Sequence, residues 1–315
     1  VSYEYRGEMI PAETDEYDEK TQVKTVVIKV DSLEEPVPLH IEDTMGDIRI
    51  SFSPDEMTET DTPPYFEEVV VDAPDFESTW KTAVGGSDVD YGNDMTVLKN
   101  GDLVAVGQTY SNDGDFEGQL KGASSAFISR YDSSGKLLHT QLLGGTRIDS
   151  YDYASSVAAL EDGGYVVAGG YQEGYGMDPS GDFAQLKTSG SVHGGIDGFL
   201  AKYDADNNLI WLKNFSGSEH DQIKQIRATE DGGIIAVVET LSNDGDMQDL
   251  NKGLFDVAVV KYDKDGEREW IRSIGGVNLE SAGFGIDIME DGSYIIGGHT
   301  SSGSGDFAGT DCYGD

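Results

Sequence analysis

Short apolar runs separated by glycine turns recur along most of the chain. An Asn-Gly or Asp-Gly pair lies between two runs rich in β-branched and aromatic residues at four places: Asn100-Gly101, Asp162-Gly163, Asp231-Gly232 and Asp291-Gly292. Such a pair between apolar runs is the strongest short-range signal of a β-hairpin, and we expect a type I′ turn with positive φ at both central residues. The pattern therefore predicts one hairpin per repeat, with no helical periodicity between the hairpins.

Two further landmarks fix the repeat. A strand carrying an aromatic residue precedes each hairpin, at Trp80, His139, Trp211 and Trp270. A pair of small residues follows it, at Gly85-Gly86, Gly144-Gly145, Ser216-Gly217 and Gly275-Gly276. A second glycine loop follows each hairpin, at Gly114-Asp115-Phe116, Gly181-Asp182-Phe183, Gly245-Asp246-Met247 and Gly305-Asp306-Phe307.

Each unit thus holds about four short strands in roughly 60 residues, which predicts an all-β fold, a β-propeller of four-stranded blades. The competing architecture is a β-solenoid, whose coils are usually shorter and lack successive hairpins. The approximate units are 80–138, 139–210, 211–269 and 270–315, the second carrying an insertion and the last lacking its final strand.

The repeats occupy residues 66–315, and residues 1–65 form an acidic N-terminal accessory segment. In that segment we expect strands at Thr25–Val30 and Asp47–Phe52. Two explanations suit the incomplete last unit. Either the chain is a fragment of a longer propeller, which we favour, or an upstream strand at Phe66–Asp72 completes the blade.

The stretch from Trp270 to Phe307, with its Gly-Gly, Glu-Asp-Gly and Ser-Gly-Asp-Phe elements, resembles the glycine-rich β-propeller repeats of bacterial secreted and cell-surface proteins. The resemblance covers the chain from about residue 76 to its end. It implies a propeller that is extracellular or on the cell surface. It implies little about activity, since members of the family are mostly uncharacterised or presumed adhesive.

Charge excludes some partners. The chain has 60 acidic and 21 basic residues, a net charge of −39, which repels nucleic acid and anionic membrane surfaces. No apolar run approaches the roughly 18 residues of a membrane-spanning helix, so we expect no membrane insertion. The single cysteine, Cys312, allows no intrachain disulfide.

The sequence shows no motif for covalent catalysis. Cys312 has no neighbouring histidine, and the five histidines lack metal-ligand spacing. The many carboxylates make any choice of a glycosidase pair arbitrary. We therefore expect that the chain is not an enzyme.

The second glycine loop is the best candidate for a metal site. It brings several oxygen donors together around a glycine bend in the first and third units, and its candidate Ca²⁺ ligands are Asp113, Asp115, Asp244 and Asp246. The alternative is that these side chains bond their own backbone in Asx turns, which the recurrence of Gly-Asp in all four units favours. The stretch Asp204–Asn208 resembles the start of an EF-hand, but Phe215 stands where a bidentate Glu is needed, so we interpret it as a turn.

The insertion in the second unit carries candidate ligand-binding residues, Tyr171, Tyr175 and His193, in an otherwise regular scaffold. Recognition residues gather on such loops, and exposed tyrosines stack on sugar rings or anchor protein partners. The alternative is an insertion without function.

Together these features predict a non-catalytic extracellular or cell-surface interaction and adhesion module that presents propeller loops to a protein or glycan. One alternative is a polysaccharide-active enzyme with acids at the propeller channel. Another is a structural subunit of a surface assembly, in which an open blade edge takes a strand from a neighbouring chain.

Overall fold

The chain forms two compact units, Val1–Thr79 and Trp80–Asp315. The computed structural model describes residues 80–172, 177–186 and 195–309, and five short strands within the first 40 residues. At residues 282–284 it describes the backbone alone. The two units are treated separately below.

The described part of the N-terminal unit consists of short antiparallel strands. They are β1 (Ser2–Tyr5), β2 (Glu8–Pro11), β3 (Thr14–Asp18), β4 (Val23–Val27) and β5 (Leu39–His40). One sheet has the order β2-β1-β5, and β3 pairs with β4. This confirms a small β accessory segment, and β4 overlaps the strand expected at Thr25–Val30. The strands expected at Asp47–Phe52 and Phe66–Asp72 lie outside the described residues.

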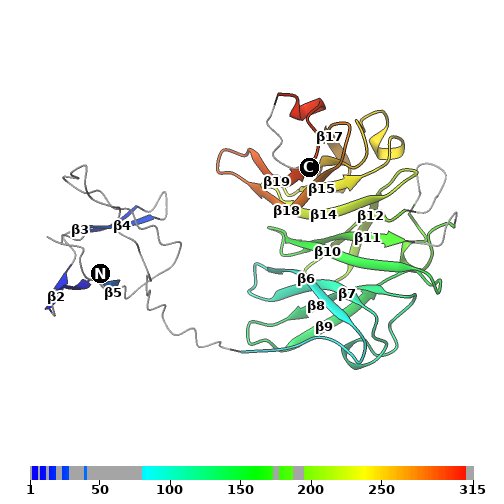
Figure 1. The fold of residues 1–315 in the computed structure, drawn as a ribbon. Helices are drawn as coiled ribbons and strands as arrows, with labels where there is room; N and C mark the ends of the chain where they lie inside the picture. Colours follow the sequence, from blue (N-terminus) through cyan, green and yellow to red (C-terminus); the bar gives the residue numbers. More distant parts are fainter. Residues whose placement is uncertain are drawn as a thin grey trace. The chain divides into compact units, whose positions relative to one another are not determined.

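The second unit is a β-propeller whose blades are antiparallel sheets in chain order (Figure 1). Blade 1 consists of β6 (Asp90–Val97), β7 (Leu103–Thr109), β8 (Ser125–Tyr131) and β9 (Leu137–Leu143). Blade 2 consists of β10 (Tyr151–Ala159), β11 (Tyr165–Gln172), β12 (Asp197–Tyr203) and β13 (Leu209–Phe215). Blade 3 consists of β14 (Asp221–Ala228), β15 (Ile234–Thr240), β16 (Asp256–Tyr262) and β17 (Arg268–Ile274). Blade 4 has two described strands, β18 (Glu280–Ile288) and β19 (Tyr294–Thr300).

The blades are offset by one strand from the sequence units. Three of the four aromatic landmarks lie on the fourth strand of a blade, where each faces a basic residue of the third strand: His139 pairs with Arg130, Trp211 with Lys202 and Trp270 with Lys261. The landmark strand that opens a sequence unit therefore ends the preceding sheet. Turn signals locate hairpins, but they do not say which hairpins share a sheet.

The hairpin turns differ in type from the one expected. Gly101 has φ of +87°, whereas Asn100 is not among the positive-φ residues, so the turn is not type I′. The Gly101 N–H donates to the Leu98 carbonyl and the Leu98 N–H donates to the Asp102 carbonyl. These bonds describe a type I turn followed by a left-handed glycine, which requires positive φ at one residue only.

The second glycine loop of each blade contains a single 3₁₀ turn. The turns are η1 (Gly114–Phe116), η2 (Gly181–Phe183), η3 (Gly245–Met247) and η4 (Gly305–Phe307). No helix in the described part of the chain is long and apolar enough to cross a membrane.

The hydrophobic core lies between the blades. One cluster joins Val104 and Val106 of blade 1 to Val157 of blade 2. Equivalent clusters lie between blades 2 and 3 and between blades 3 and 4. Each blade therefore depends on its neighbours for burial of its faces, as expected for a radial repeat.

Candidate functional site

Each second glycine loop pairs with the small-residue loop that precedes its blade, in a contact that we call the loop latch. In blade 1 the Asp115 N–H donates to the Gly85 carbonyl at 3.1 Å, and the Gly85 N–H donates to Asp115 Oδ2 at 3.0 Å. The latch recurs in every blade, between Asp182 and Gly144, Asp246 and Ser216, and Asp306 and Gly275. The aspartate that recurs in the sequence thus joins two loops that lie about 30 residues apart.

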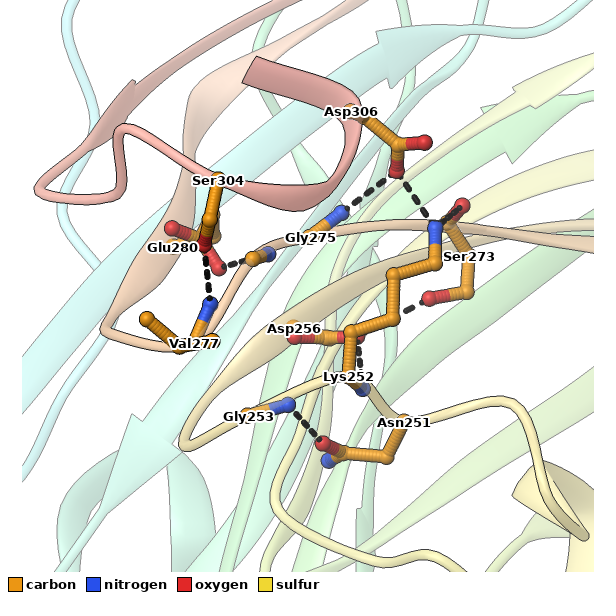
Figure 2. A network of polar contacts seen from close by, with 11 residues as sticks. Asn251, Lys252, Gly253, Asp256, Ser273, Gly275, Val277, Glu280, Ser304 and Asp306 are labelled. Carbon is orange, nitrogen blue, oxygen red and sulfur yellow. Dashed lines mark hydrogen bonds and ion pairs between the residues drawn. The ribbon is translucent and has the colours of Figure 1, made fainter. Parts of the chain in front are cut away.

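The latch belongs to a longer series in which four consecutive backbone N–H groups meet four separate side chains. Figure 2 shows the first three of these contacts in the copy at blade 4. Its donors and acceptors are Gly275 to Asp306 Oδ2 (2.9 Å), Gly276 to Glu280 Oε2 (2.8 Å), Val277 to Ser304 Oγ (3.1 Å) and Asn278 to Ser302 Oγ (2.9 Å). In blade 1 residues 85–88 donate in the same order to Asp115, Asp90, Asp113 and Ser111. Successive N–H groups form an anion-binding concavity, and here the chain fills it with its own oxygens.

The close approach of the two loops explains their glycines. A Cβ on Gly86 would lie 2.4 Å from Asp113 Oδ1. Gly114 has φ of +61°, and a Cβ there would lie 2.4 Å from the Gly85 carbonyl oxygen. Any larger residue would push the loops apart and break the latch.

Basic residues accompany three of the latches. Lys252 Nζ lies 2.5 Å from Asp306 Oδ2, and Arg268 Nη1 lies 3.0 Å from Asp246 Oδ1 (Figure 2 shows the former). Lys121 forms the equivalent ion pair with Asp182. The contact with Lys252, followed by the Gly275 N–H, lowers the pKa of Asp306.

The four predicted calcium ligands all take part in this series. Asp115 and Asp246 are latch residues, and Asp113 and Asp244 accept the N–H groups of Ser87 and Ser218 at 2.7 Å. Their partners lie in the other loop, so they serve neither as simple Asx turns nor as free oxygens. Across the described residues no group of three or more His, Cys, Asp or Glu side chains is arranged to hold a metal ion. The calcium hypothesis is put to a direct test at the end of this subsection.

The EF-hand-like stretch is a turn, as interpreted. Asp204 Oδ1 accepts the N–H groups of Asp206 and Asn208, at 2.9 and 2.8 Å. Asn207 has φ of +66° and stands where the equivalent turns have Gly135 and Gly266. The residues that looked like metal ligands therefore close a hairpin.

Three acids gather at the boundary between blades 2 and 3. The pKa of Asp197 is raised to about 8, first by burial and then by the nearby charges of Asp221 and Asp246. Burial raises the pKa of Asp221 to about 7, although hydrogen bonds from Thr240 and Ser242 oppose the shift. Burial also raises the pKa of Asp246. Asp197 and Asp221 have the most strongly raised pKa values among the described carboxyl groups.

The predicted ligand residue Tyr171 belongs to this acid cluster. It is 2% exposed, its ring stacks on Phe183 at a centroid distance of 4.7 Å, and its hydroxyl opposes the rise in the pKa of Asp197. The expectation that Tyr171 is exposed for a ligand is therefore wrong, because its strand faces the core between blades 1 and 2. Tyr175 and His193, the other two candidates, lie outside the described residues.

Sequence reasoning did not single out Asp197 or Asp221. A signal for Asp221 existed, because an acid follows every small-residue pair, at Asp90, Asp152, Asp221 and Glu280. Asp197 recurs only in part, because its equivalent is Asp256 in blade 3 but Ser125 in blade 1. Its acidity is therefore not common to all blades.

The chain is thus a β-propeller of latched blades with one cluster of perturbed acids. No family model matches the chain. It is 26% identical over 198 residues to the regulatory protein FlaEY of Caulobacter vibrioides; this stretch is 60% of the present chain and 19% of that protein. The chain therefore spans less than a fifth of the length of this curated relative. A crystal structure of a protein of unknown function from Bacteroides caccae aligns with a TM-score of 0.24 and 10% identity, over 62% of this chain and 71% of that one.

Loss of a latch should destabilise the propeller. Asp246→Ala leaves the Ser216 N–H without its acceptor and Arg268 without its ion pair, and we expect a loss of about 1–3 kcal/mol in the free energy of unfolding. Urea unfolding of the full chain measures it. Glu230→Ala, an exposed acid in a hairpin turn, should change it by less than about 0.5 kcal/mol. Equal effects of the two variants would mean that the latch contributes nothing.

The latch geometry also bears on calcium. An ion at Asp115 or Asp246 would compete with the N–H groups that those carboxylates already accept. We therefore expect the thermal midpoint to differ by less than about 1 °C between millimolar Ca²⁺ and excess chelator. A larger rise with Ca²⁺ that Asp115→Ala and Asp246→Ala together abolish would instead establish the loops as calcium sites.

The acid cluster should make stability depend on pH. Because the pKa of Asp197 is about 8 in the folded chain and about 3.9 when unfolded, the native state holds the extra proton between these values. Stability should then fall as pH rises from about 4 to about 8, by up to about 1.4 kcal/mol per pH unit. Urea unfolding at several pH values should show a shallower fall for Asp197→Asn. Asp197→Ser, which introduces the residue that blade 1 has at this position, should show the same shallower fall. If the slope of stability against pH is unchanged in both variants, Asp197 is not the group responsible.

Proposed function

We propose that this chain is a non-catalytic interaction and adhesion module, extracellular or on the cell surface, which presents its latched loops to a protein or glycan. The observation that carries the proposal is a set of large apolar side chains exposed on those loops. Ile148 is 94% exposed, Val277 62% and Leu254 56%. Exposed apolar side chains on a fixed frame are the usual anchors of recognition.

The loops that carry these side chains are firmly held. Ile148 and Val277 lie in small-residue loops fixed by the series of side-chain acceptors. Loops of neighbouring blades are also bonded to each other, since the Leu254 N–H donates to the Asn278 carbonyl at 3.2 Å and the Ala123 N–H donates to the Ser150 carbonyl at 2.9 Å. A partner would therefore meet a preorganised surface, which lowers the entropy cost of binding.

A second candidate, a polysaccharide-active enzyme, has one observation in its favour. The raised pKa values of Asp197 and Asp221 are of the kind that a general acid needs near neutral pH. Against it, Asp221 accepts hydrogen bonds from Thr240 at 2.5 Å and Ser242 at 2.9 Å, and it is fully buried. Its oxygens thus serve the fold, so we rank this function second.

The test uses defined probes on the full chain: a printed glycan array and a random-peptide phage library. Probes that bind the full chain should bind Ile148→Ser/Val277→Ser at least about tenfold more weakly, because both anchors are lost. Leu209→Ser, at a side chain 43% exposed on an outer strand, is the matched control and should bind normally. All three proteins should unfold at similar temperatures.

Two results would overturn the proposal. If the double variant binds as well as the full chain, the loops are not the recognition surface. If the full chain releases reducing ends from polysaccharides and Asp197→Asn does not, the second candidate is correct.

A further inference from the structure

Three tyrosines form a row where blade 1 meets blade 2, at the ends of the strands that carry the latched loops. Tyr110 directly follows β7, and Tyr151 and Tyr153 lie at the start of β10. The ring centroids lie 6.3 Å apart between Tyr110 and Tyr151 and 6.2 Å apart between Tyr151 and Tyr153, each pair edge to face. All three residues are partly exposed, and none belongs to a core cluster or to a latch. We call these residues the tyrosine row.

The fold makes room for the row at this boundary alone among the blades whose register is described. Tyr153 holds the position that Gln222 has in blade 3 and Ser281 has in blade 4. Gly170 stands opposite Tyr153, where Glu239 stands opposite Gln222. A Cβ on Gly170 would lie 2.7 Å from the Tyr153 hydroxyl oxygen, so the glycine admits the ring.

A buried side chain orients the middle of the row. The Tyr151 hydroxyl donates to Gln108 Oε1 at 3.4 Å, and Gln108 Nε2 donates to Ser124 Oγ at 2.9 Å. Gln108 is 6% exposed and Ser124 fully buried. The Tyr151 ring therefore keeps a set direction, which lowers the entropy cost of binding a ligand on it.

The row ends beside a group of polar side chains of blade 3. Burial raises the pKa of Tyr153, and the nearby charges of Tyr151 and Glu239 add to the rise. Lys224 Nζ lies 3.4 Å from Glu239 Oε2 and 3.3 Å from Gln222 Oε1. An ammonium group, a carboxylate and an amide thus offer donors and acceptors next to an aromatic ring.

The backbone beside the row is already paired, which bears on the kind of ligand. Strand β10 lies between β6 and β14 (Figure 1). The Asn93 amide donates to the Ala154 carbonyl of β10 at 2.7 Å. The Ser155 hydroxyl of β10 donates to the Ile223 carbonyl of β14 at 2.6 Å. An extended peptide gains its affinity from a free sheet edge, whereas a ligand here must be held by side chains.

These side chains suit a sugar. A tyrosine ring presents an apolar face and a polar tip, and a sugar ring has an apolar C–H face and hydroxyl groups that both donate and accept. A net charge of −39 opposes anionic ligands. The chemistry of the row and its surroundings therefore favours a neutral saccharide over a strand-like peptide or an acidic glycan.

We propose that the tyrosine row binds a neutral saccharide, whose C–H face packs on Tyr110 and Tyr151 and whose hydroxyl groups pair with Lys224 and Glu239. The inference rests on the proposed function and narrows its partner to a glycan. It also gives the glycan a site on the inner strands, three residues along the chain from the loop anchor Ile148.

The test screens the full chain on an array of neutral and anionic oligosaccharides and measures each hit by isothermal titration calorimetry. The hits should be neutral, and Tyr110→Ala and Tyr151→Ala should each raise the dissociation constant at least about tenfold, because a stacking face is lost. Tyr110→Phe and Tyr151→Phe keep the rings and should bind within about threefold of the full chain. Leu209→Ser, at an exposed outer-strand position, is the matched control and should bind normally.

Three results would overturn the inference: no neutral oligosaccharide binds, only anionic ones bind, or the alanine variants bind as tightly as the full chain while unfolding at the same temperature. A peptide from the phage library that needs the row, with no saccharide bound, would make it a protein site instead.

Failure of the inference and failure of the proposed function are distinguishable. If Ile148→Ser/Val277→Ser loses binding and the tyrosine variants do not, the proposed function stands and the inference is wrong. If the tyrosine variants lose saccharide binding and the double variant does not, the sugar site stands and the loop anchors are wrong. If neither set loses binding, both are wrong.

Discussion

The propeller depends on side-chain oxygens that accept runs of consecutive backbone N–H groups. A loop crossing from the outer strand of one blade to the inner strand of the next cannot pair its amides in a sheet, and unpaired buried amides are costly. Here Gly275, Gly276, Val277 and Asn278 each donate to a separate side chain, and blade 1 repeats the full arrangement at residues 85–88. The acceptors lie in the second glycine loop of the blade that follows and at the start of that blade's first strand. Each crossing is therefore bonded to the blade that it enters.

This arrangement explains why each blade behaves as a structural unit whose two faces differ. The latch fixes a blade's loops, and the core then forms between the second strand of one blade and the first strand of the next blade. Stability in such a repeat is close to a sum of blade terms and neighbour terms. Ile226 and Met95 hold equivalent positions, yet one is buried and the other exposed. Ile226 packs against blade 2, whereas no blade is described before Met95.

Much of the fold could be predicted from sequence because its signals are local. Asn100-Gly101 and its equivalents located the first hairpin of every blade, although the glycine alone takes positive φ. The sequence could not show which four strands form one blade. Whether the strand of Trp211 ends one sheet or begins the next depends on tertiary pairing. The candidate site was harder still. Asp115 and Asp246 stood out through recurrence, but their partners lie in another loop, and the chemistry of Asp197 arises from charges brought near it by folding. Tyr171 looked like an insertion residue, whereas its strand runs into the core.

In this protein, residues that recur in every blade are therefore best distinguished from residues that confer a specific function. A residue type that returns in every blade, such as the latch aspartate, answers a constraint that every blade shares. Part of the acidity has the same origin, since a carboxylate accepts an amide N–H well and suits a concavity of amides. Binding specificity must come from positions that differ among blades. Ile148, Leu254 and Val277 are such positions, because they stand exposed on latched loops without apolar counterparts in every repeat. The regular part of each blade supplies rigidity, and the irregular part supplies the surface that a partner can distinguish.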